Sequence, residues 1–571
     1  MKKNLTLILA GLIGSAACFA TPLTPQQALD RASANGSKRI KSKSMTNLTP
    51  VYTAESESGV RGAYIFNIPE GGFLILSADD LCYPVLGYSN EGAIDVNNLP
   101  VQLKSWLRGY CDQLEYVIDE GLDASVTAYK MTTRSDNPSI APMLKTKWDQ
   151  GAPYNDSCPE INGRHTYTGC VATSMAQVMN YFKYPEVGTG RVTVNVNGVN
   201  SSMTLSDYPF DWANMSDYYI AGKYTDAQAA AVATLMKACG YSVGMSYGLS
   251  ASGAQSAKIS VALKKYFNYD SGITYQSRIG YSASEWQQKI YASLAGGSPV
   301  IYGGQDPAEG GHSFVCDGYD KDGYFHFNWG WGGMADGYFT LNALNPEALG
   351  TGGGSGGGFN FMQHAVLNIK KPTGGTTESG LAMLTAAGGL KVDNVSGSTI
   401  QLGLQGYYDP CWMNESDSQL NLALGGVFTQ EGSTEVVAVG TATLAGKTNC
   451  TLGSGTYYPY VSSSGSYIRV SVNVPSSLPN GTYKMTLSGR EANHPTWAYE
   501  PVITPYGYPN YVMVTKNGSK IEAQTIPVPK VEMTTAAIEG PLYYKRNVTI
   551  KATLVNISDF VLTCSPMIVL K

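Results

Sequence analysis

Apolar and polar positions repeat with helical spacing in the stretch that follows Cys170. The apolar residues there are Val171, Met175, Val178, Met179 and Phe182. Residues that recur every three or four positions share one face of a helix. Thr168 and Gly169 come just before this run, where a helix cap and a tight entry belong. The pattern therefore predicts a buried helix whose first turn carries a cysteine.

The place of Cys170 within that helix favours a reactive thiol. Backbone N–H groups in a first helical turn lack helical partners and the helix dipole is positive there, so both favour the thiolate. A thiolate at a helix N-terminus is an activated nucleophile. The alternative is that Cys170 is only a small buried side chain at the start of a helix.

Alternation and turn residues further along predict the two strands of a hairpin, one after the glycine pair at 310–311 and one over 324–328. His312 stands at the head of the first strand, and Asn328 and Trp329 stand at the end of the second. We expect these ends to lie side by side. A cysteine nucleophile needs a histidine to share its proton and a third group to orient the imidazole. The hairpin would supply both.

These stretches resemble the motifs of the streptopain family of secreted cysteine peptidases, and interpain-like members in particular. The matching runs are Gly-Cys-Val-Ala-Thr at 169–173, Gly-His-Ser-Phe-Val at 311–315 and Asn-Trp-Gly-Trp-Gly-Gly at 328–333. They occur in the order and approximate separation of the family, and the similarity extends over residues 21–371. The resemblance implies a papain-like α+β catalytic fold, an inhibitory propeptide and hydrolysis of peptide bonds in proteins.

The resemblance also implies roles for single residues. Cys170 would be the nucleophile and His312 the general base, with Asn328 or Trp329 orienting or shielding the imidazole. Gln150 would donate a hydrogen bond to the oxyanion, unless it is an ordinary turn residue. The residues implied to border the substrate are Ser250, Ser252 and Gly311.

The chain divides into segments of different pattern. We expect a signal peptide at 1–20, an α+β propeptide at 21–134, the papain-like domain at 135–371, an immunoglobulin-like β-sandwich at 372–527 and the start of a further, incomplete β module at 528–571. The polar linker at 128–137 is the natural place for activation cleavage. Cys18 leaves open the alternative of an outer-surface lipoprotein anchored through a lipid on that residue.

Composition excludes several classes of protein. The chain has 571 residues, a net charge of −5 and only 15% charged residues, which does not favour a nucleic-acid or anionic-membrane partner. No later stretch is apolar enough for a transmembrane helix. The 10 cysteines are scattered singly, so neither a zinc site nor a dense disulfide framework is expected. We expect no metal and no cofactor. Most thiols should be buried and unpaired, although Cys411 and Cys450 could pair.

The remaining histidines are not expected to be the general base, although His165 lies close to Cys170 in the sequence. We expect His165 to be exposed in a polar loop, His326 to alternate with its strand neighbours and His364 to be structural. His494 should be structural or exposed.

Two functions fit this sequence. One is a secreted cysteine endopeptidase, inhibited by its own propeptide, whose C-terminal domain contacts a cell surface or matrix. The other is a secreted binding or adhesion protein that keeps the fold without turnover. The intact set of Cys170, His312, Gln150, Asn328 and Trp329 favours the first.

Overall fold

The computed structural model describes residues 21–34, 48–56, 58–119, 137–281, 283–306, 310–341, 361–373, 384–405, 411–414, 419–453, 456–505, 508–526, 531–539 and 549–556. The predicted signal peptide, Cys18 and most of the predicted cleavage linker lie outside the described residues.

The N-terminal segment has the predicted order of helix, strands and helix. Its elements are α1 (Pro25–Ala34), β1 (Tyr52–Glu55), β2 (Arg61–Asn67), β3 (Phe73–Ser77), β4 (Val85–Ser89), η1 (Val96–Asn98) and α2 (Val101–Asp119). The four strands pair with their chain neighbours in antiparallel fashion. Leu103, Trp106, Leu107 and Tyr110 on α2 are buried at helical spacing, so this helix has one apolar side.

In the predicted catalytic segment, helices and short strands come first and a run of strands comes last. Its first elements are β5 (Glu160–Ile161), β6 (Arg164–His165), α4 (Cys170–Phe182), β7 (Arg191–Val196), β8 (Val199–Thr204), η2 (Leu205–Asp207), α5 (Asp226–Ser242) and α6 (Ala257–Phe267). They are followed by β9 (Thr274–Ser277), η3 (Arg278–Gly280), α7 (Ala283–Ala295), β10 (Val300–Asp306), β11 (Gly310–Tyr319), β12 (Phe325–Asn328), β13 (Gly337–Phe339) and β14 (Phe361–Leu367). The predicted helix that begins at Cys170 and the two predicted hairpin strands are all present.

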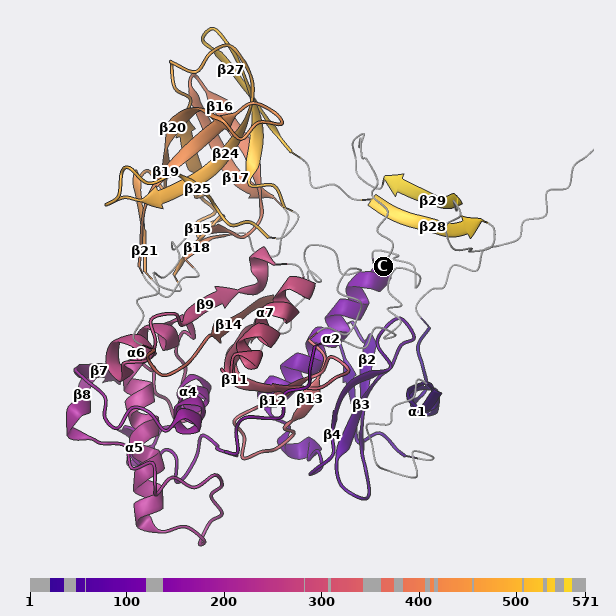
Figure 1. The fold of residues 1–571 in the computed structure, drawn as a ribbon, viewed down its shortest axis with the longest axis vertical. Coiled ribbons are helices and arrows are strands. Elements are labelled where there is room, and N and C mark those ends of the chain that lie inside the picture. The colour runs from indigo at the N-terminus through magenta and orange to yellow at the C-terminus, as the bar shows by residue number, and fades with distance from the viewer. Residues whose placement is uncertain are drawn as a thin grey trace, which may run out of the picture.

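A single sheet joins the N-terminal segment to the catalytic segment. Its strand order is β1-β2-β3-β4-β13-β12-β11-β10-β14-β9 (Figure 1). The junction is the antiparallel pair β4–β13, in which Tyr88 lies opposite Tyr338 and Gly87 opposite Phe339. A side chain at Gly87 would meet the Phe339 ring at 2.8 Å, so glycine permits this close contact. The predicted propeptide, 21–134, thus shares one sheet with the predicted catalytic segment.

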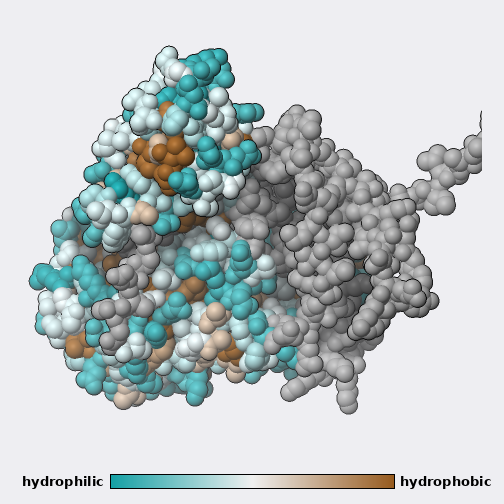
Figure 2. All heavy atoms as spheres, turned by 45° about the horizontal axis from the view of Figure 1, so that its top comes forward, coloured by the Kyte–Doolittle hydropathy of each residue, from teal (hydrophilic) through white to brown (hydrophobic). Residues whose placement is uncertain are grey.

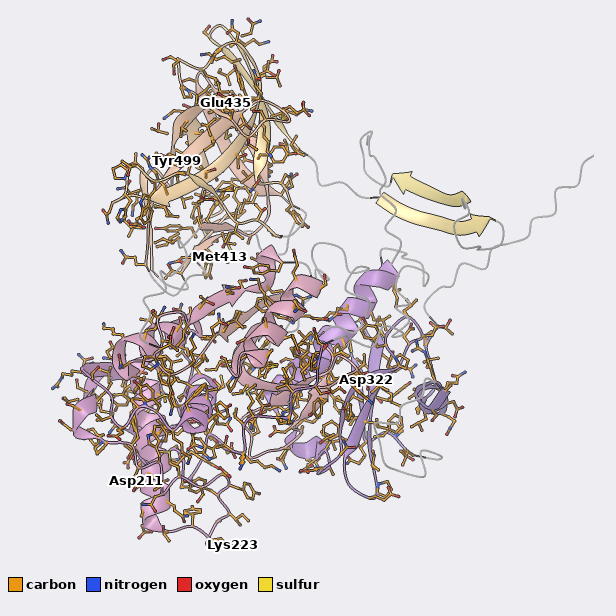
Figure 3. All side chains as sticks on the ribbon, in the orientation of Figure 1. Asp211, Lys223, Asp322, Met413, Glu435 and Tyr499 are labelled. Carbon is orange, nitrogen blue, oxygen red and sulfur yellow. The ribbon has the colours of Figure 1, made fainter. Side chains whose placement is uncertain are left out.

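The two faces of this sheet carry different cores. One core lies against α2 and includes Trp106, Phe314, Phe327 and Trp329. The other lies against α4 and includes Val315. Figure 3 shows side chains filling the space between α2 and the neighbouring strands. The N-terminal segment therefore supplies half of a hydrophobic core that the catalytic strands complete.

The C-terminal segment is built from strands. They are β15 (Leu384–Ala386), β16 (Gly389–Ser396), β17 (Thr399–Gln405), β18 (Cys411–Asn414), β19 (Leu420–Thr429), β20 (Val436–Leu444), β21 (Asn449–Leu452), β22 (Tyr457–Pro459), β23 (Val470–Asn473), β24 (Gly481–Glu491), β25 (Glu500–Pro501), β26 (Tyr511–Asn517) and β27 (Lys520–Thr525). The larger sheet runs β16-β17-β23-β20-β19-β24-β26-β27. Its end strands meet where Val392 N donates to Thr525 Oγ1 at 2.9 Å, so the sheet curls around one core. The immunoglobulin-like assignment stays a prediction.

The C-terminal strands touch the catalytic segment through a small apolar contact. Met413, labelled in Figure 3, packs with Ala387 and Cys411 against Ile279 of η3. A last hairpin, β28 (Val531–Glu539) and β29 (Thr549–Asn556), falls within the predicted further β module.

The cysteines of the described residues are free thiols, and most are buried. This confirms the expectation of unpaired buried thiols, and the possible Cys411–Cys450 bond is not formed. None of the helices within the described residues combines the length and the apolar run that a membrane crossing requires.

Candidate functional site

Cys170 is the first residue of α4, as its sequence context predicts. Gly169 is the N-cap, with φ of 85°, and it offers no side-chain hydrogen bond. A Cβ on Gly169 would lie 2.8 Å from both Met245 Sδ and Ser252 O, so the entry to the helix requires glycine. The expected cap Thr168 instead pairs its hydroxyl with Thr173 Oγ1 at 2.9 Å.

The Cys170 thiol is partly exposed but closely surrounded by protein atoms. Desolvation raises its pKa from the ordinary 9.0, while backbone N–H groups of Ser313, Val171 and Cys170 itself act in the opposite direction. The helix N-terminus thus lowers the pKa of the thiol as expected, but the opposite effect of burial is larger. In the chain that keeps its N-terminal segment, burial therefore favours the neutral thiol of Cys170 over the thiolate that the helix position favours.

We therefore expect Cys170 in the full chain to alkylate slowly at neutral pH. The thiolate is the reacting form, and a pKa above the ordinary 9.0 leaves little of it at pH 7. The rate of iodoacetamide labelling, measured by mass spectrometry on the Cys170 peptide, should rise with pH through a midpoint above that value. The Cys170→Ala chain gives the background. A midpoint on the acidic side of neutrality would contradict the burial argument.

His312 lies near the start of β11, where it pairs with Gly304 of β10. The next residue, Ser313, shares a 2.8 Å hydrogen bond with Ser174 on α4, and this contact ties the histidine strand to the cysteine helix. Side chains of a strand alternate between its two faces. Ser313 faces α4 and Phe314 faces the α2 core, so the alternation assigns His312 to the α2 face.

Gln150 is held beside the start of the cysteine helix. Its carbonyl accepts a hydrogen bond from Thr168 N at 3.2 Å, and its own N–H donates to Asp149 Oδ1 at 2.7 Å. Trp148, fully buried, anchors the same segment through a 2.8 Å bond from Nε1 to Ser216 O. Gln150 is thus near Cys170, as the sequence interpretation requires.

Asn328 is the last residue of β12 and Trp329 follows it, but Asn328 is not opposite His312. In the register it faces Val315. Its Oδ1 accepts from Gln177 Nε2 at 3.0 Å and from Gly330 N at 3.1 Å, and its Nδ2 donates to Thr146 O at 2.7 Å. These bonds occupy both acceptor positions of Oδ1. The amide of Asn328 is therefore bound to α4 through Gln177 and to the loop residues Gly330 and Thr146.

Trp329 is completely buried in the α2 core. Its ring lies 4.7 Å from that of Phe314, its N–H donates to Asp336 at 2.9 Å and its Nε1 donates to Ala335 O at 3.0 Å. Burial raises the pKa of Asp336 to about 7.

The residues implied to border the substrate occupy different environments. Ser250 and Gly311 are exposed. Ser252 is buried, with its hydroxyl donating to Tyr167 O at 2.7 Å and accepting from Gly248 N at 3.1 Å. Ser252 shapes the loop beside Gly169, whereas Ser250 and Gly311 are open to solvent.

The other histidines have partners of their own. His165 is exposed, as expected, and its Nδ1 lies 3.0 Å from Cys158 O. His326 is paired with buried Asp317 at 2.6 Å, which raises the pKa of the imidazole against the opposing effect of burial. His364 is buried and lies 5.3 Å from the Tyr275 ring. His494 is exposed and stacks on Trp497 at 4.0 Å.

Buried polar residues that join the elements of the site were not among the residues predicted from the sequence. They are Thr146, Ser174, Ser313 and Gln177. A signal was present on α4, because Ser174 and Gln177 are polar residues on the helical face that starts at Cys170.

Comparison with known proteins finds relatives over these same segments. The model of the peptidase C10 family matches residues 148–339, and the Spi protease inhibitor model matches residues 20–114. Streptopain from Streptococcus pyogenes is 37% identical over 328 residues, which cover 54% of this chain and 80% of streptopain. The thiol protease/hemagglutinin PrtT from Porphyromonas gingivalis is 38% identical over 324 residues, which cover 54% of this chain and 37% of PrtT.

Solved structures of relatives are also similar to part of this chain. A prointerpain A fragment from Prevotella intermedia is 33% identical with a TM-score of 0.47, covering 57% of this chain and 99% of that one. Active interpain A from the same organism is 39% identical with a TM-score of 0.36, covering 40% of this chain and 94% of that one. The family match includes every residue from Gln150 to Trp329, and the inhibitor match extends from α1 to Leu114 within α2.

Proposed function

Because the chain belongs to the peptidase C10 family of cysteine peptidases, we propose that it is a secreted endopeptidase made as a zymogen, in which Cys170 and His312 cleave peptide bonds in proteins. The observation that carries this proposal is the contact of α4 with β11. It holds the first residue of the helix beside the backbone of Ser313, the residue that follows His312.

The chemistry follows from the residue types. His312 takes the proton of Cys170, and the thiolate attacks the carbonyl carbon of the substrate. The backbone N–H of Cys170 and the side-chain amide of Gln150 donate to the oxyanion. The imidazolium then gives its proton to the leaving amine, and water releases the acyl group.

The N-terminal segment, with its match to an inhibitor family, acts as the propeptide. Alternation along β11 assigns His312 to the face that α2 covers, while Cys170 lies on the α4 face. Burial of Cys170 raises the pKa of its thiol in the same state. Both features support latency, because removal of 21–134 would free β11 to bring His312 to Cys170.

The precursor should convert itself to a shorter form by a cut within about residues 125–145. The cut depends on its own thiol, and Pro142 excludes the bond directly before it because that bond lacks an amide hydrogen. Tyr129 is an apolar residue two positions before the bond that follows Lys130, so that bond is a candidate for the cut. N-terminal sequencing of the product under reducing conditions identifies the site. Cys170→Ala precursor should stay whole until active enzyme is added.

Two results would contradict the proposed function. Mature protein that neither hydrolyses protein nor labels stoichiometrically with a thiol-directed active-site reagent would be the silent binding protein instead. Full activity with an N-terminus near Thr21 would show that the first segment is not inhibitory.

Gln150→Ala should lower kcat by about 10²–10³-fold, since one oxyanion donor is lost. KM should change little, and Cys170 should still alkylate at its wild-type rate. Steady-state kinetics on the mature enzyme measure both constants. An unchanged kcat would remove Gln150 from the oxyanion site.

The C-terminal strands would serve contact with a cell surface or matrix. Figure 2 shows a hydrophobic patch on the face of this segment that the view presents. The strand β20 exposes Val436, Val437 and Val439, with 54%, 39% and 38% of their surfaces accessible. Exposed apolar patches often mark interaction surfaces, which supports this role.

A further inference from the structure

One amide on the cysteine helix contacts the other segments of the site. Gln177 is completely buried on α4, and its Oε1 accepts from Thr146 Oγ1 at 2.8 Å and from Trp148 N at 3.4 Å. Its Nε2 donates to Asn328 Oδ1 at 3.0 Å. The side chain thereby joins the helix of Cys170 to the segment that leads to Gln150 and to the end of β12.

The partners of Gln177 are bound to each other as well. Asn328 Nδ2 donates to Thr146 O at 2.7 Å, which closes a ring of buried polar groups. Gly330, with φ of 73°, approaches the helix so closely that a Cβ there would lie 3.3 Å from Thr173 Cγ2 and 3.9 Å from Gln177 Nε2. Buried networks of this kind are specific when every member is satisfied and costly when one is removed.

Cys170, Ser174 and Gln177 lie at helical spacing on one face of α4. The first is adjacent to the backbone of Ser313, the second bonds the Ser313 hydroxyl and the third bonds Asn328. This polar face determines how far along β11 and β12 the helix sits and how it is rotated. An apolar face would allow the helix to slide, because hydrophobic contact is not directional.

We propose that Gln177 is a positioning residue of the peptidase, which holds Cys170 and Gln150 in register with the β11–β12 strands. Gln177 does not touch the reacting atoms. It acts through the place of the helix, and Asn328 is its partner rather than a partner of the imidazole. This proposal rests on the proposed function, since it concerns the geometry of the same cleavage reaction.

The test compares substitutions of similar size on one helix. Gln177→Met keeps the length of the side chain and removes its hydrogen bonds. Asn180→Met is the control, because Asn180 is also buried on α4 but lies outside the ring of bonds. We expect kcat of mature Gln177→Met to fall about 10–100-fold, as for a displacement near 1 Å, with KM changed less than about threefold. Asn180→Met should keep kcat within about twofold even where its Tm falls.

Gln177→Glu supplies a pH readout that a purely structural role would not move. Burial raises the pKa of such a carboxyl group, and its protonated form can donate to Asn328 as the amide does. The ratio of the Gln177→Glu kcat to the wild-type kcat should therefore rise as the pH is lowered. A ratio that is constant with pH, or an equal loss of kcat in Asn180→Met, would overturn the proposal.

Different results would contradict the positioning role of Gln177 and the proposed peptidase function. Absence of hydrolysis by mature wild-type protein overturns the function. The rate of Cys170 alkylation then tests the position of the thiol, because this measurement does not require turnover. Gln177→Met should change that rate at least about threefold relative to wild type and Asn180→Met, and an unchanged rate contradicts positioning.

Discussion

Replacing Cys170 by alanine should lower the rate of peptide hydrolysis by at least about 10⁴-fold, because the reaction loses its nucleophile and the covalent route. His312→Ala should cost a similar factor, since the thiol then lacks its base. The two losses should not add in the double variant, because the residues act as one unit. Initial rates on a peptide substrate, measured after the propeptide is removed by active wild-type enzyme, give these factors.

A matched control separates chemistry from folding. Cys316 is another buried cysteine, on the same strand as His312, and its side chain belongs to the α2 core. Cys316→Ala should keep most of the activity, and the thermal unfolding of Cys170→Ala should be close to that of wild type. An inactive Cys316→Ala with an active Cys170→Ala would show that the nucleophile is assigned to the wrong thiol.

Replacing Trp106 by alanine should destabilise the precursor by about 3–5 kcal/mol and speed its maturation. Trp106 is 3% exposed, and its ring lies 5.0 Å from that of Phe327 and 6.0 Å from that of Phe314. It therefore holds α2 on the strand that carries His312. Loss of this contact frees the strand, and with it the imidazole. Denaturant unfolding and the time course of the size change on gels measure the two effects.

Leu29→Ala is the control for that prediction. Leu29 is buried on α1 among Tyr64, Phe66 and Leu74, and it lies in a core other than that of Trp106. Its truncation costs stability of about the same order, about 2–5 kcal/mol. Maturation should be faster in Trp106→Ala than in Leu29→Ala. Equal rates would mean that general destabilisation, and not release of β11, sets the speed of activation.

The N-terminal segment shows which features of the fold can be predicted from sequence patterns and which cannot. Its strands were predictable, because alternation and turn residues act over a few positions. The join between β4 and β13 was not, because Tyr88 and Tyr338 are far apart in the chain and either strand could serve as a free edge. The stacking of these rings at 5.2 Å exists only after the chain has folded.

The sequence by itself determined the cysteine helix and the histidine strand, and it predicts which groups react. Helix and strand periods, glycine positions and the chemistry of a thiol beside an imidazole are local properties. Tertiary structure decided the partners of Asn328, which bonds Gln177 and Thr146 at separations of 151 and 182 residues. It also decided the direction in which the pKa of Cys170 is shifted, since burial raises the pKa that the helix N-terminus lowers. Hydrogen-bond partners and desolvation depend on which distant segments meet, and no short pattern of residues specifies that meeting.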